Sequence, residues 1–457
     1  MINKISAFFN SKTVLILGFG KEGQSTYHFF KKFHPSACIA IADQDPYALD
    51  RIQFPVEKEI KFYSGPHYLN AIRNYDMVIK TPGIPRETVL AKAGQAEVTS
   101  QTNLFLRFFR DRIIGVTGTK GKSTTSSLIR HILFKHDGCS FLVGNIGLPP
   151  FDYVSQLSED SHIVFELSSH QLHDVMYSPH IAIFLNLFEE HLDHYGTLEN
   201  YRQAKNNIFR FQKDGDFLIF NGDNSYLHNI KMLDVKGTRV EYALHNRPGV
   251  SMYANELGDV YLKEATELIS FRVSARKALP GKHNLLNIMS AVKACRLLGI
   301  PVDTITSGVN EFKGLEHRLE FVGIFKGIRF YNDSIATVPE ATIEAIHTLP
   351  DTDTIILGGK DRGINYNLLI EFLPKTAIRN FICMGDAGKR IYDGVRKNLS
   401  DNQKAFMISD FSSLSEIISQ QTEPGKICLL SPAASSYDWF HNFEERGKAF
   451  KKIAENL

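Results

Sequence analysis

The segment Gly115–Thr125 (Gly-Val-Thr-Gly-Thr-Lys-Gly-Lys-Ser-Thr-Thr) constrains the fold of this chain more than any other stretch. It follows the apolar residues Ile113 and Ile114, and it precedes Ser126–Leu133, whose apolar residues have helical spacing. A strand, a glycine-rich turn, a Lys-Ser pair and a helix together form a cradle for phosphate. Glycines let backbone N–H groups approach the oxygens, and the helix N-terminus adds partial positive charge.

The two residues after the last loop glycine suit nucleotide chemistry. Lys122 would reach the β- and γ-phosphates of a nucleotide, and Ser123 would bind Mg²⁺. The strict Walker pattern asks for glycine where Val116 stands, whereas Gly115 comes one position early and Gly118 lies inside the loop. We predict a nucleotide site, with a tight strand-to-helix connection as the alternative.

Bulk properties limit the classes of protein that need consideration. A length of 457 residues predicts roughly three domains. The net charge of +2 is too near neutral to indicate a nucleic-acid or membrane partner. The five cysteines form no Cys-x-x-Cys pair, which favours a reducing compartment over a disulfide framework or a zinc cluster. No apolar stretch approaches the ~18 residues of a membrane span, so we expect a cytoplasmic, soluble monomer.

The N-terminal part has the pattern of a Rossmann-like βαβ unit. Thr13–Gly23 is an apolar strand followed by a Gly-x-Gly-x-x-Gly turn, Ser25–Lys32 is amphipathic, and Cys38–Asp43 is a second strand that ends in an acid. A dinucleotide with Asp43 on its ribose would fit, as would any other nucleotide diphosphate. Asp76–Pro85 is a strand that runs into a Pro/Gly turn, where such a sheet meets its ligand.

Apolar strands alternate with helical segments through the rest of the chain, which predicts an α/β fold with three domains. We expect a Rossmann-like domain over 1–107 and a central phosphate-loop ATPase domain with a mostly parallel sheet over 108–314. Within the central domain, 235–280 favours short antiparallel strands. A second Rossmann-like domain is expected over 315–457, where four strands each end in a small or polar turn.

Further motifs, in order along the chain, resemble those of the Mur ligase family, the ATP-dependent amide-forming enzymes of peptidoglycan synthesis. The resemblance is greatest to the branch that adds D-glutamate, and it covers essentially the whole chain. Its phosphate loop is of the Gly-Thr-x-Gly-Lys-Ser/Thr type, which accounts for the departure from the Walker pattern. The motifs are Gly118–Thr124, Gly144–Gly147, Glu166–Leu172, Glu190–Tyr195, Lys205, His283–Asn287, His317-Arg318, Asn332–Ser334 and Leu430–Gly447.

The resemblance implies an ATP site and two Mg²⁺ sites. Lys122, His191 and Lys205 would be the catalytic residues, with Lys205 carbamylated, because a free ammonium would repel the metal. The residues implied for ATP are Gly118, Thr119, Lys120, Gly121, Lys122, Ser123, Thr124, Asn284, Asn287, Arg318 and Asp333. Those implied for the metals are Ser123, Glu166, His191 and Lys205. Contacts from both the central and the third domain imply closure on ATP.

Each assignment has a plainer alternative in the sequence itself. Glu166 could be a solvated loop carboxylate, Lys205 an exposed helical lysine and Asn284 a helix cap. The run Glu190–His194 could suggest zinc, although it lacks the His-Glu-x-x-His order. Only the family resemblance favours the functional role over the plainer alternative for each of these residues.

The resemblance also implies the substrates, UDP-N-acetylmuramoyl-L-alanine and glutamate. The residues implied for the UDP part are Gly20, Lys21, Glu22, Asp43, Gln44, Thr81 and Gly83. Asn145 and His191 would lie near the muramoyl-alanine end. The residues implied for the amino acid are Thr337, Arg362, Ser436 and Phe443, and Phe443 could equally be a core residue.

One position departs from the family. Asp333–Thr337 is Asp-Ser-Ile-Ala-Thr where the family commonly has Asp-Ser-Lys-Ala-Thr. Ile335 removes a cation near the amino acid, so L-glutamate stays open beside D-glutamate. A nicotinamide-dependent dehydrogenase and a nucleotide switch are the alternatives from other classes. A folate polyglutamate ligase would lack the Rossmann-like first domain.

Overall fold

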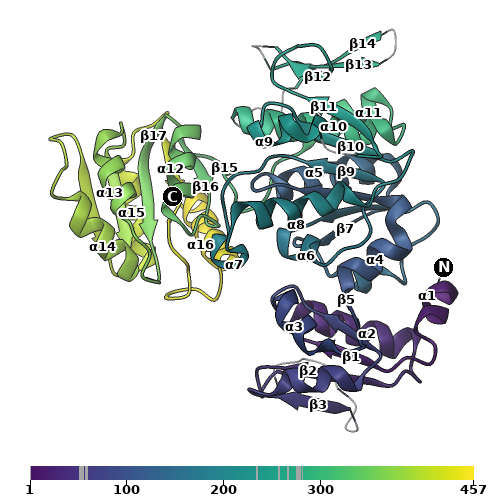
Figure 1. The fold of residues 1–457 in the computed structure, drawn as a ribbon. Coiled ribbons are helices and arrows are strands. Elements are labelled where there is room, and N and C mark those ends of the chain that lie inside the picture. Colours follow the sequence, from purple (N-terminus) through teal and green to yellow (C-terminus); the bar gives the residue numbers. More distant parts are fainter. Residues whose placement is uncertain are drawn as a thin grey trace. The chain divides into compact units, whose positions relative to one another are not determined.

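The computed structural model describes residues 2–50, 56, 60–232, 235–255, 258–264, 267–273, 279 and 281–457. It contains three sheets with helices on their faces (Figure 1), which confirms the predicted α/β fold class. Its contacts divide the chain into two compact units. The first is Met1–Val273 with Lys282–Asn310, and the second is Ser274–Gly281 with Glu311–Leu457.

The N-terminal sheet of the first unit has five parallel strands in the order β3-β2-β1-β4-β5. The central strand β1 is buried at every position, as expected for a parallel strand with both faces covered. Its strands are β1 (Val14–Leu17), β2 (Ile39–Asp43), β3 (Lys61–Ser64), β4 (Met77–Lys80) and β5 (Glu97–Ser100). Its helices are α1 (Ile2–Phe9), α2 (Lys21–Phe33), η1 (Tyr68–Asn74), α3 (Arg86–Ala93) and α4 (Gln101–Phe109).

The second sheet of this unit has nine strands in the order β14-β13-β12-β11-β10-β9-β6-β8-β7. Its strands are β6 (Ile113–Thr117), β7 (Ser140–Gly144), β8 (His162–Glu166), β9 (Ile181–Phe184), β10 (Phe217–Asn221), β11 (Thr238–Tyr242), β12 (Val250–Ala254), β13 (Val260–Glu264) and β14 (Glu267–Phe271). Its helices are η2 (Arg110–Arg112), α5 (Lys122–Asp137), η3 (Pro150–Tyr153), α6 (Ser169–His173), α7 (Leu192–Tyr195), α8 (Leu198–Arg210), α9 (Ser225–His228), η4 (Asn229–Met232), α10 (Lys282–Leu297) and α11 (Val302–Glu311).

The antiparallel arrangement predicted for 235–280 holds for β12, β13 and β14 but is wrong for β11. That strand pairs in parallel with both β10 and β12, and so extends the parallel part of the sheet. The helix α10 packs against β10, β11 and β12, next to the point where the parallel strands of the sheet give way to the antiparallel ones. The burial of β11 against a helix is a tertiary effect that a five-residue pattern does not reveal.

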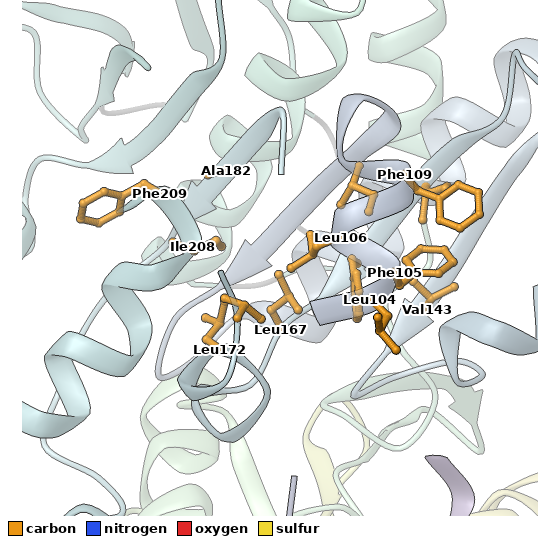
Figure 2. Close-up of a cluster of buried hydrophobic side chains, with 14 of the residues drawn as sticks. Leu104, Phe105, Leu106, Phe109, Val143, Leu167, Leu172, Ala182, Ile208 and Phe209 are labelled. Carbon is orange, nitrogen blue, oxygen red and sulfur yellow. The ribbon is translucent and has the colours of Figure 1, made fainter. Parts of the chain in front are cut away.

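One apolar helix joins the cores of the two sheets. Leu104, Phe105 and Leu106 of α4 are all buried, and three consecutive buried positions span more than half of a helix's circumference, so other elements must pack around most of it. Figure 2 shows α4 side chains beside Val143 and Leu167 of the nine-stranded sheet region. The same cluster includes residues of α1 and α2. This shared core explains why both sheets fall in one compact unit, and the boundary at 107 stays a prediction.

The second unit contains a six-stranded sheet in the order β15-β16-β20-β17-β18-β19, parallel apart from the β15–β16 hairpin. The four predicted strands are present, while edge strands β15 and β19 were missed because they lack a long buried apolar run. The strands are β15 (Glu320–Phe325), β16 (Ile328–Asn332), β17 (Thr352–Gly358), β18 (Asn380–Met384), β19 (Lys404–Ile408) and β20 (Ile427–Leu430). The helices are α12 (Pro339–Thr348), α13 (Asn367–Phe372), η6 (Leu373–Lys375), α14 (Gly385–Val395), η7 (Phe411–Ser413), α15 (Leu414–Gln421) and α16 (Phe443–Glu455).

Within the described ranges, no helix has both the length and the apolar character needed to cross a bilayer.

Candidate active site

The phosphate loop connects β6 to α5 through a glycine that no other residue can replace without strain. Gly121 has φ 86° and precedes the first helical residue, Lys122. A Cβ atom at Gly121 would lie 2.4 Å from Oδ1 of Asn287, well inside the contact limit. The start of α10 therefore packs directly onto the loop. Asn287 Nδ2 donates to Asn284 Oδ1 at 3.1 Å, and Asn284 lies inside the first turn of α10 rather than at its cap.

The side chain of Lys122 folds back over its own loop. Its Nζ donates to the carbonyl oxygens of Gly118 at 2.8 Å and Thr119 at 3.0 Å. The loop is supported from its other side, because Lys120 N donates to Asn186 Oδ1 at 2.9 Å. The ammonium charge is thus held at the loop, as the predicted phosphate contact requires.

Lys205 is not the exposed helical lysine that its place on α8 would suggest. Its side chain is 1% exposed, and its Nζ donates to Gly118 O at 2.9 Å and to Thr117 Oγ1 at 3.4 Å. Burial lowers the pKa of this amine well below its usual range. The nearby charge of Lys122 lowers it further, and the carboxylates of Glu190 and Glu166 act in the opposite direction. Because α8 packs on β6 and β9, this position faces the phosphate loop instead of water.

Glu166 ends β8 as a fully buried residue, so the alternative of a solvated loop carboxylate is wrong. One carboxylate oxygen, Oε1, accepts a hydrogen bond from Asn145 Nδ2 at 2.9 Å. The other, Oε2, has no hydrogen-bond partner among the described residues. A buried carboxylate oxygen without a partner is costly unless a cation compensates it. The donor set at this strand end therefore fits a hard divalent cation.

His191 lies at the entrance to this region in an unusual backbone conformation. Its φ is 59°, a left-handed value that few residues other than glycine adopt. Its imidazole is 46% exposed, and Nε2 lies 3.8 Å from Glu190 Oε2. The other oxygen of Glu190 accepts from Lys120 Nζ at 2.8 Å. Burial raises the pKa of Glu190, but the ion pair with Lys120 and the nearby charges of His191 and Lys122 together outweigh burial, and the net shift is downward.

A cavity of about 610 Å³ brings residues of both sheets of the first unit together. Among the predicted site residues, its walls include Lys21, Glu22, Gly83, Lys122, Asn145, His191 and Lys205. The remaining lining residues were given no individual site role, although all but Pro82, Pro149 and Tyr201 lie in the family motifs named above: Pro82, Gly144, Gly147, Pro149, Ser168, Ser169, His170, Gln171, Glu190 and Tyr201. The cavity thus joins the phosphate loop to the turns after β1 and β4.

Two of these additional residues shape the cavity. His170 packs its ring 5.3 Å from that of His191, and burial followed by neighbouring positive groups lowers the pKa of His170 to about 4. Gln171 donates to Glu22 Oε1 at 2.8 Å, while burial raises the pKa of Glu22. Ser168 and Gln171 form a capping box at the start of α6, a pattern that the sequence could have revealed.

The other four residues predicted for the UDP part lie at strand ends of the same sheet but do not line this cavity. Asp43 accepts from Phe19 N at 2.6 Å and from Asp45 N at 2.8 Å. Thr81 lies against Gly18, where a Cβ atom would come within 2.1 Å of Thr81 Oγ1. Gly20 and Gln44 are exposed.

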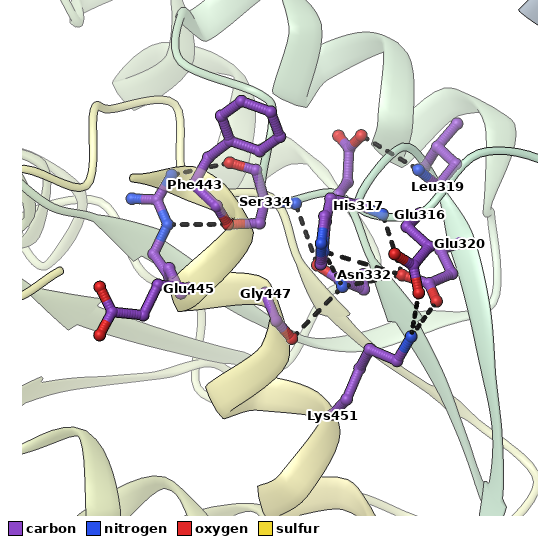
Figure 3. A network of polar contacts seen from close by, with 12 residues as sticks. Glu316, His317, Leu319, Glu320, Asn332, Ser334, Phe443, Glu445, Gly447 and Lys451 are labelled. Atoms are coloured by element: carbon purple, nitrogen blue, oxygen red, sulfur yellow. Dashed lines mark hydrogen bonds and ion pairs between the residues drawn. The ribbon is translucent and has the colours of Figure 1, made fainter. Parts of the chain in front are cut away.

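In the second unit, a buried polar network fixes the loop that carries Arg318 (Figure 3). His317 has φ 64°, and its Nδ1 lies 2.9 Å from Asn332 Nδ2. A Cβ atom at Gly447 would lie 2.1 Å from the same nitrogen, so α16 approaches this histidine closely. Arg318 is exposed next to the network. Asp333 is 5% exposed and accepts from Ser431 Oγ at 2.8 Å, and burial raises the pKa of Asp333 to about 7.

Arg446 holds together three of the four segments predicted to bind the amino acid. Its fully buried guanidinium donates to Ser334 Oγ at 3.0 Å, Ser334 O at 2.7 Å and Ala434 O at 3.0 Å. Thr337 and Ser436 follow these two loops. Phe443 begins α16, and its carbonyl oxygen accepts from Ser334 Oγ at 2.8 Å. Phe443 is half-buried, so its side chain is neither fully enclosed in the core nor fully exposed to solvent.

Arg362 lies apart from these contacts, exposed in the loop after β17. Its neighbour Asp361 accepts from Arg390 at 2.8 Å. Sequence reasoning missed Arg446, because a charged residue at a helical position ordinarily reads as exposed.

Comparison with known proteins gives consistent matches along the whole chain. Residues 116–295 match the Mur ligase middle domain. The UDP-N-acetylmuramoylalanine--D-glutamate ligase of Symbiobacterium thermophilum is 34% identical over 406 residues, which cover 87% of this chain and 88% of that relative. The ligase of the same name from Clostridium tetani is 30% identical over 462 residues, covering 100% of this chain and 99% of that relative.

The chain belongs to the Mur ligase family. Solved structures of Mur ligases share its fold at lower identity. The UDP-N-acetylmuramoylalanyl-D-glutamyl-2,6-diaminopimelate--D-alanyl-D-alanyl ligase of Acinetobacter baumannii has 17% identity and a TM-score of 0.61, covering 96% of this chain and 90% of that one. The UDP-N-acetylmuramate-alanine ligase of Thermotoga maritima has 17% identity and a TM-score of 0.57, covering 97% and 99%. These matches support the predicted architecture of a Mur ligase.

The zinc alternative gains no support from the structure of this Mur ligase. Among the described side chains, which do not include that of Asp193, no three His, Cys, Asp or Glu residues converge on one point.

Proposed function

We propose that this Mur ligase catalyses the ATP-dependent addition of D-glutamate to UDP-N-acetylmuramoyl-L-alanine. Its relatives are named for the ligation of UDP-N-acetylmuramoylalanine and D-glutamate. The observation that carries the proposal is the cavity that joins the phosphate loop, with Lys122 and Lys205, to the turns of the N-terminal sheet. One substrate would lie across that cavity with its reactive carboxylate at the loop.

In this proposal the phosphate loop binds ATP. Lys122 and the loop amides hold the phosphates, since both ATP and a carboxylate substrate are anionic and phosphoryl transfer between them needs compensating charge. The residues assigned to ATP in the first unit are Gly118, Thr119, Lys120, Gly121, Lys122, Ser123, Thr124, Asn284 and Asn287. Arg318 and Asp333 in the second unit keep their assignment to ATP.

The residues present fit the two Mg²⁺ ions that the family resemblance implies. Ser123 and Glu166 would hold one ion, and the unpartnered Oε2 of Glu166 supports this assignment. His191 and Lys205 would hold the other, after Lys205 has taken up CO₂ as a carbamate. Only an uncharged amine reacts with CO₂, and burial favours that form of Lys205. The metal ions would supply positive charge to the transferred phosphoryl group.

The reaction has two chemical steps. The substrate carboxylate attacks the γ-phosphorus of ATP, which releases ADP and forms an acyl phosphate. The amine of glutamate then attacks the acyl carbon, the bond to the phosphate oxygen breaks, and an amide, phosphate and one proton are released. Activation is needed because a free carboxylate is a poor electrophile, and bound substrates gain from proximity.

The remaining substrate assignments rest on the family resemblance. We assign the UDP part to Gly20, Lys21, Glu22, Asp43, Gln44, Thr81 and Gly83, and the muramoyl-alanine end to Asn145 and His191. We assign glutamate to Thr337, Arg362, Ser436 and Phe443 of the second unit. The buried bonds of Arg446 support a common role for Thr337, Ser436 and Phe443.

Family membership favours the ligase over the nicotinamide dehydrogenase and the nucleotide switch. The names of both relatives specify D-glutamate, which favours D over L despite Ile335. A monomer and a cytoplasmic location stay predictions from the sequence.

The decisive experiment measures ADP release with UDP-N-acetylmuramoyl-L-alanine and either D- or L-glutamate. We expect release that depends on both substrates, with D-glutamate preferred, and its loss in Lys122→Ala. Release that needs no glutamate would contradict the proposed reaction. A preference for L-glutamate would leave the reaction in place and reverse the stereochemistry.

A further inference from the structure

A second cavity of about 390 Å³ lies in the first unit, between α3 of the N-terminal sheet and helices α6, α7 and α8. We call it the α8 cavity. Its lining shares no residue with the cavity of the proposed active site. Its lining residues are Pro85, Arg86, Glu87, His173, His194, Tyr195, Asn200, Gln203, Ala204, Asn207 and Arg210.

One face of α8 forms the floor of this cavity. Asn200, Gln203, Ala204 and Asn207 follow the i, i+3, i+4, i+7 spacing of a single helical face. The amide nitrogens of Asn200 and Asn207 already donate to backbone carbonyls, of Tyr195 at 2.9 Å and of Leu172 at 3.0 Å. These bonds fix both amides, and Gln203 Nε2 likewise donates to Glu199 Oε1 at 3.4 Å. Asn207 Oδ1 already accepts from Arg210, so Asn200 and Gln203 are the residues that offer carbonyl oxygens to a ligand that brings donors. Ala204 leaves room between Asn200 and Asn207.

Two arginines from different elements give the α8 cavity positive charge. Arg210, at the end of α8, is exposed and donates to Asn207 Oδ1 at 3.4 Å, and it forms no ion pair with a carboxylate of the described residues. Arg86 Nε lies 3.6 Å from Asp174 Oδ1, but Asp174 also forms a buried ion pair with Lys80. The negative charge of Asp174 is therefore shared between Lys80 and Arg86, so the guanidinium of Arg86 can still attract an anion.

Glu87, the acidic residue of this lining, does not cancel the positive charge of the two arginines. Glu87 is 74% exposed, and its Oε1 lies 3.7 Å from Nε2 of His173. Water screens exposed charges of either sign, and the two guanidinium groups outnumber this one carboxylate, so the lining keeps a net positive charge.

We propose that the α8 cavity binds a small organic anion that carries its own hydrogen-bond donors. The carboxylate or phosphate group of the ligand contacts Arg86 and Arg210, since guanidinium groups match the paired oxygens of both anions. Hydroxyl or amine groups of the same ligand donate to the amide oxygens of Asn200 and Gln203. Polycarboxylates and phosphate esters both have this chemistry.

The α8 cavity is separated from the active-site cavity by a pair of histidine rings. His194 lines the α8 cavity and His170 lines the other, and their ring centroids lie 4.3 Å apart. A ligand in the α8 cavity would contact one side of a wall whose other side faces the proposed substrate.

The test is calorimetric titration of the full chain without ATP or substrate, using citrate, tricarballylate (citrate without its hydroxyl) and glycerol 3-phosphate as probes. We compare wild type, Arg210→Ala and Arg202→Ala. Arg202 is on the same helix but does not line the cavity, and it pairs with Glu199 at 3.5 Å. A probe that binds at the phosphate loop does so in all three proteins, so such binding does not affect the comparison between them.

We expect citrate or glycerol 3-phosphate to bind wild type, and the stronger of the two identifies the anion. Arg210→Ala should weaken that binding by about tenfold or more, the usual effect of losing a hydrogen bond to a charged group. Arg202→Ala should bind as wild type does, and tricarballylate should bind more weakly than citrate. Absence of binding by both preferred probes, or equal affinities of the two variants, would overturn the proposal. Ligase activity plays no part in this readout, so the result is independent of the proposed reaction.

Discussion

Lys205 Nζ donates a hydrogen bond to the carbonyl oxygen of Gly118 at 2.9 Å, which ties a buried amine of α8 to the phosphate loop. The two residues belong to motifs that are far apart in the chain. The bond brings the amine within reach of the proposed nucleotide site, and burial keeps it from water. Burial then depresses the pKa of the amine, and this shift has consequences for both stability and activity.

Stability should depend on pH through Lys205. The unfolded chain keeps the ordinary pKa of 10.5, whereas the folded chain has a lower one. Between the two values the unfolded state binds more protons, so the stability of the fold rises with pH across that window. Lys205→Met removes the ionisable group. We expect it to be more stable than wild type near neutral pH, with a difference that shrinks as pH approaches 10.5.

Urea unfolding at several pH values in CO₂-free buffer measures that difference. A difference that stays constant from neutral pH to pH 10.5 would show that Lys205 does not titrate differently in the folded chain.

Activity should depend on the modified form of the same residue. We expect Lys205→Ala to lose nearly all ligase activity, because the carbamate oxygens that would hold the second metal ion are absent. A small added carboxylate such as acetate should restore part of it. ADP release in the presence and absence of acetate is the measurement, and wild-type rates without acetate would refute the carbamate role.

Two glycines that flank α5 provide a matched pair of substitutions to test the nucleotide site. Gly121 before the helix and Gly138 after it both have left-handed backbone conformations, with φ 86° and 70°. A Cβ atom at Gly121 would collide with Asn287, whereas nothing lies within 4 Å of one at Gly138. Both alanine variants pay roughly 1–2 kcal/mol of backbone strain. Only Gly121→Ala should lose binding of a non-hydrolysable ATP analogue in calorimetry, and equal affinities would contradict this.

Asn145 should affect metal binding through its hydrogen bond to Glu166. Removing a side chain that orients a metal ligand typically costs about 10–100-fold in metal affinity. We therefore expect Asn145→Ala to raise the Mg²⁺ concentration for half-maximal activity by about that factor, and Glu166→Gln to raise it further. Mg²⁺ titrations of ADP release at saturating ATP provide the measurement. An unchanged Mg²⁺ requirement in both variants would remove Glu166 from the metal site.

Arg446 should be a determinant of stability in the second unit. Its substitution by methionine leaves the carbonyl oxygens of Ser334 and Ala434 buried without donors, at about 1–3 kcal/mol for each unsatisfied group. We expect Arg446→Met to lower the thermal unfolding temperature. Lys452→Ala, on the exposed side of the same helix, is the control and should be near neutral. Calorimetric unfolding curves that coincide for the two variants would disprove the bridging role.

Several elements of this fold were predictable because their signal is local. The strand β6 that leads into the phosphate loop, the helix α5 that begins at Lys122 and the strand that ends at Glu166 all follow from short apolar runs and glycine turns. The edge strands β15 and β19 were not predictable in this way, since neither has a long buried apolar run. The parallel pairing of β11 was not predictable either, since its partners β10 and β12 are set by the tertiary structure. The shared core around Phe105 likewise depends on contacts between two sheets.

The sequence alone determined the family, the phosphate loop and the residue types around it, because these are encoded in motifs a few residues long. Only the tertiary structure decided that Lys205, Glu166 and Arg446 are buried. Each would be solvated in an isolated helix or strand end. The packing of α8 on the sheet, the pairing of β8 and the docking of α16 remove water from these side chains. That loss of water changes a surface amine into one of lowered pKa, and a surface carboxylate into one that fits a metal ion.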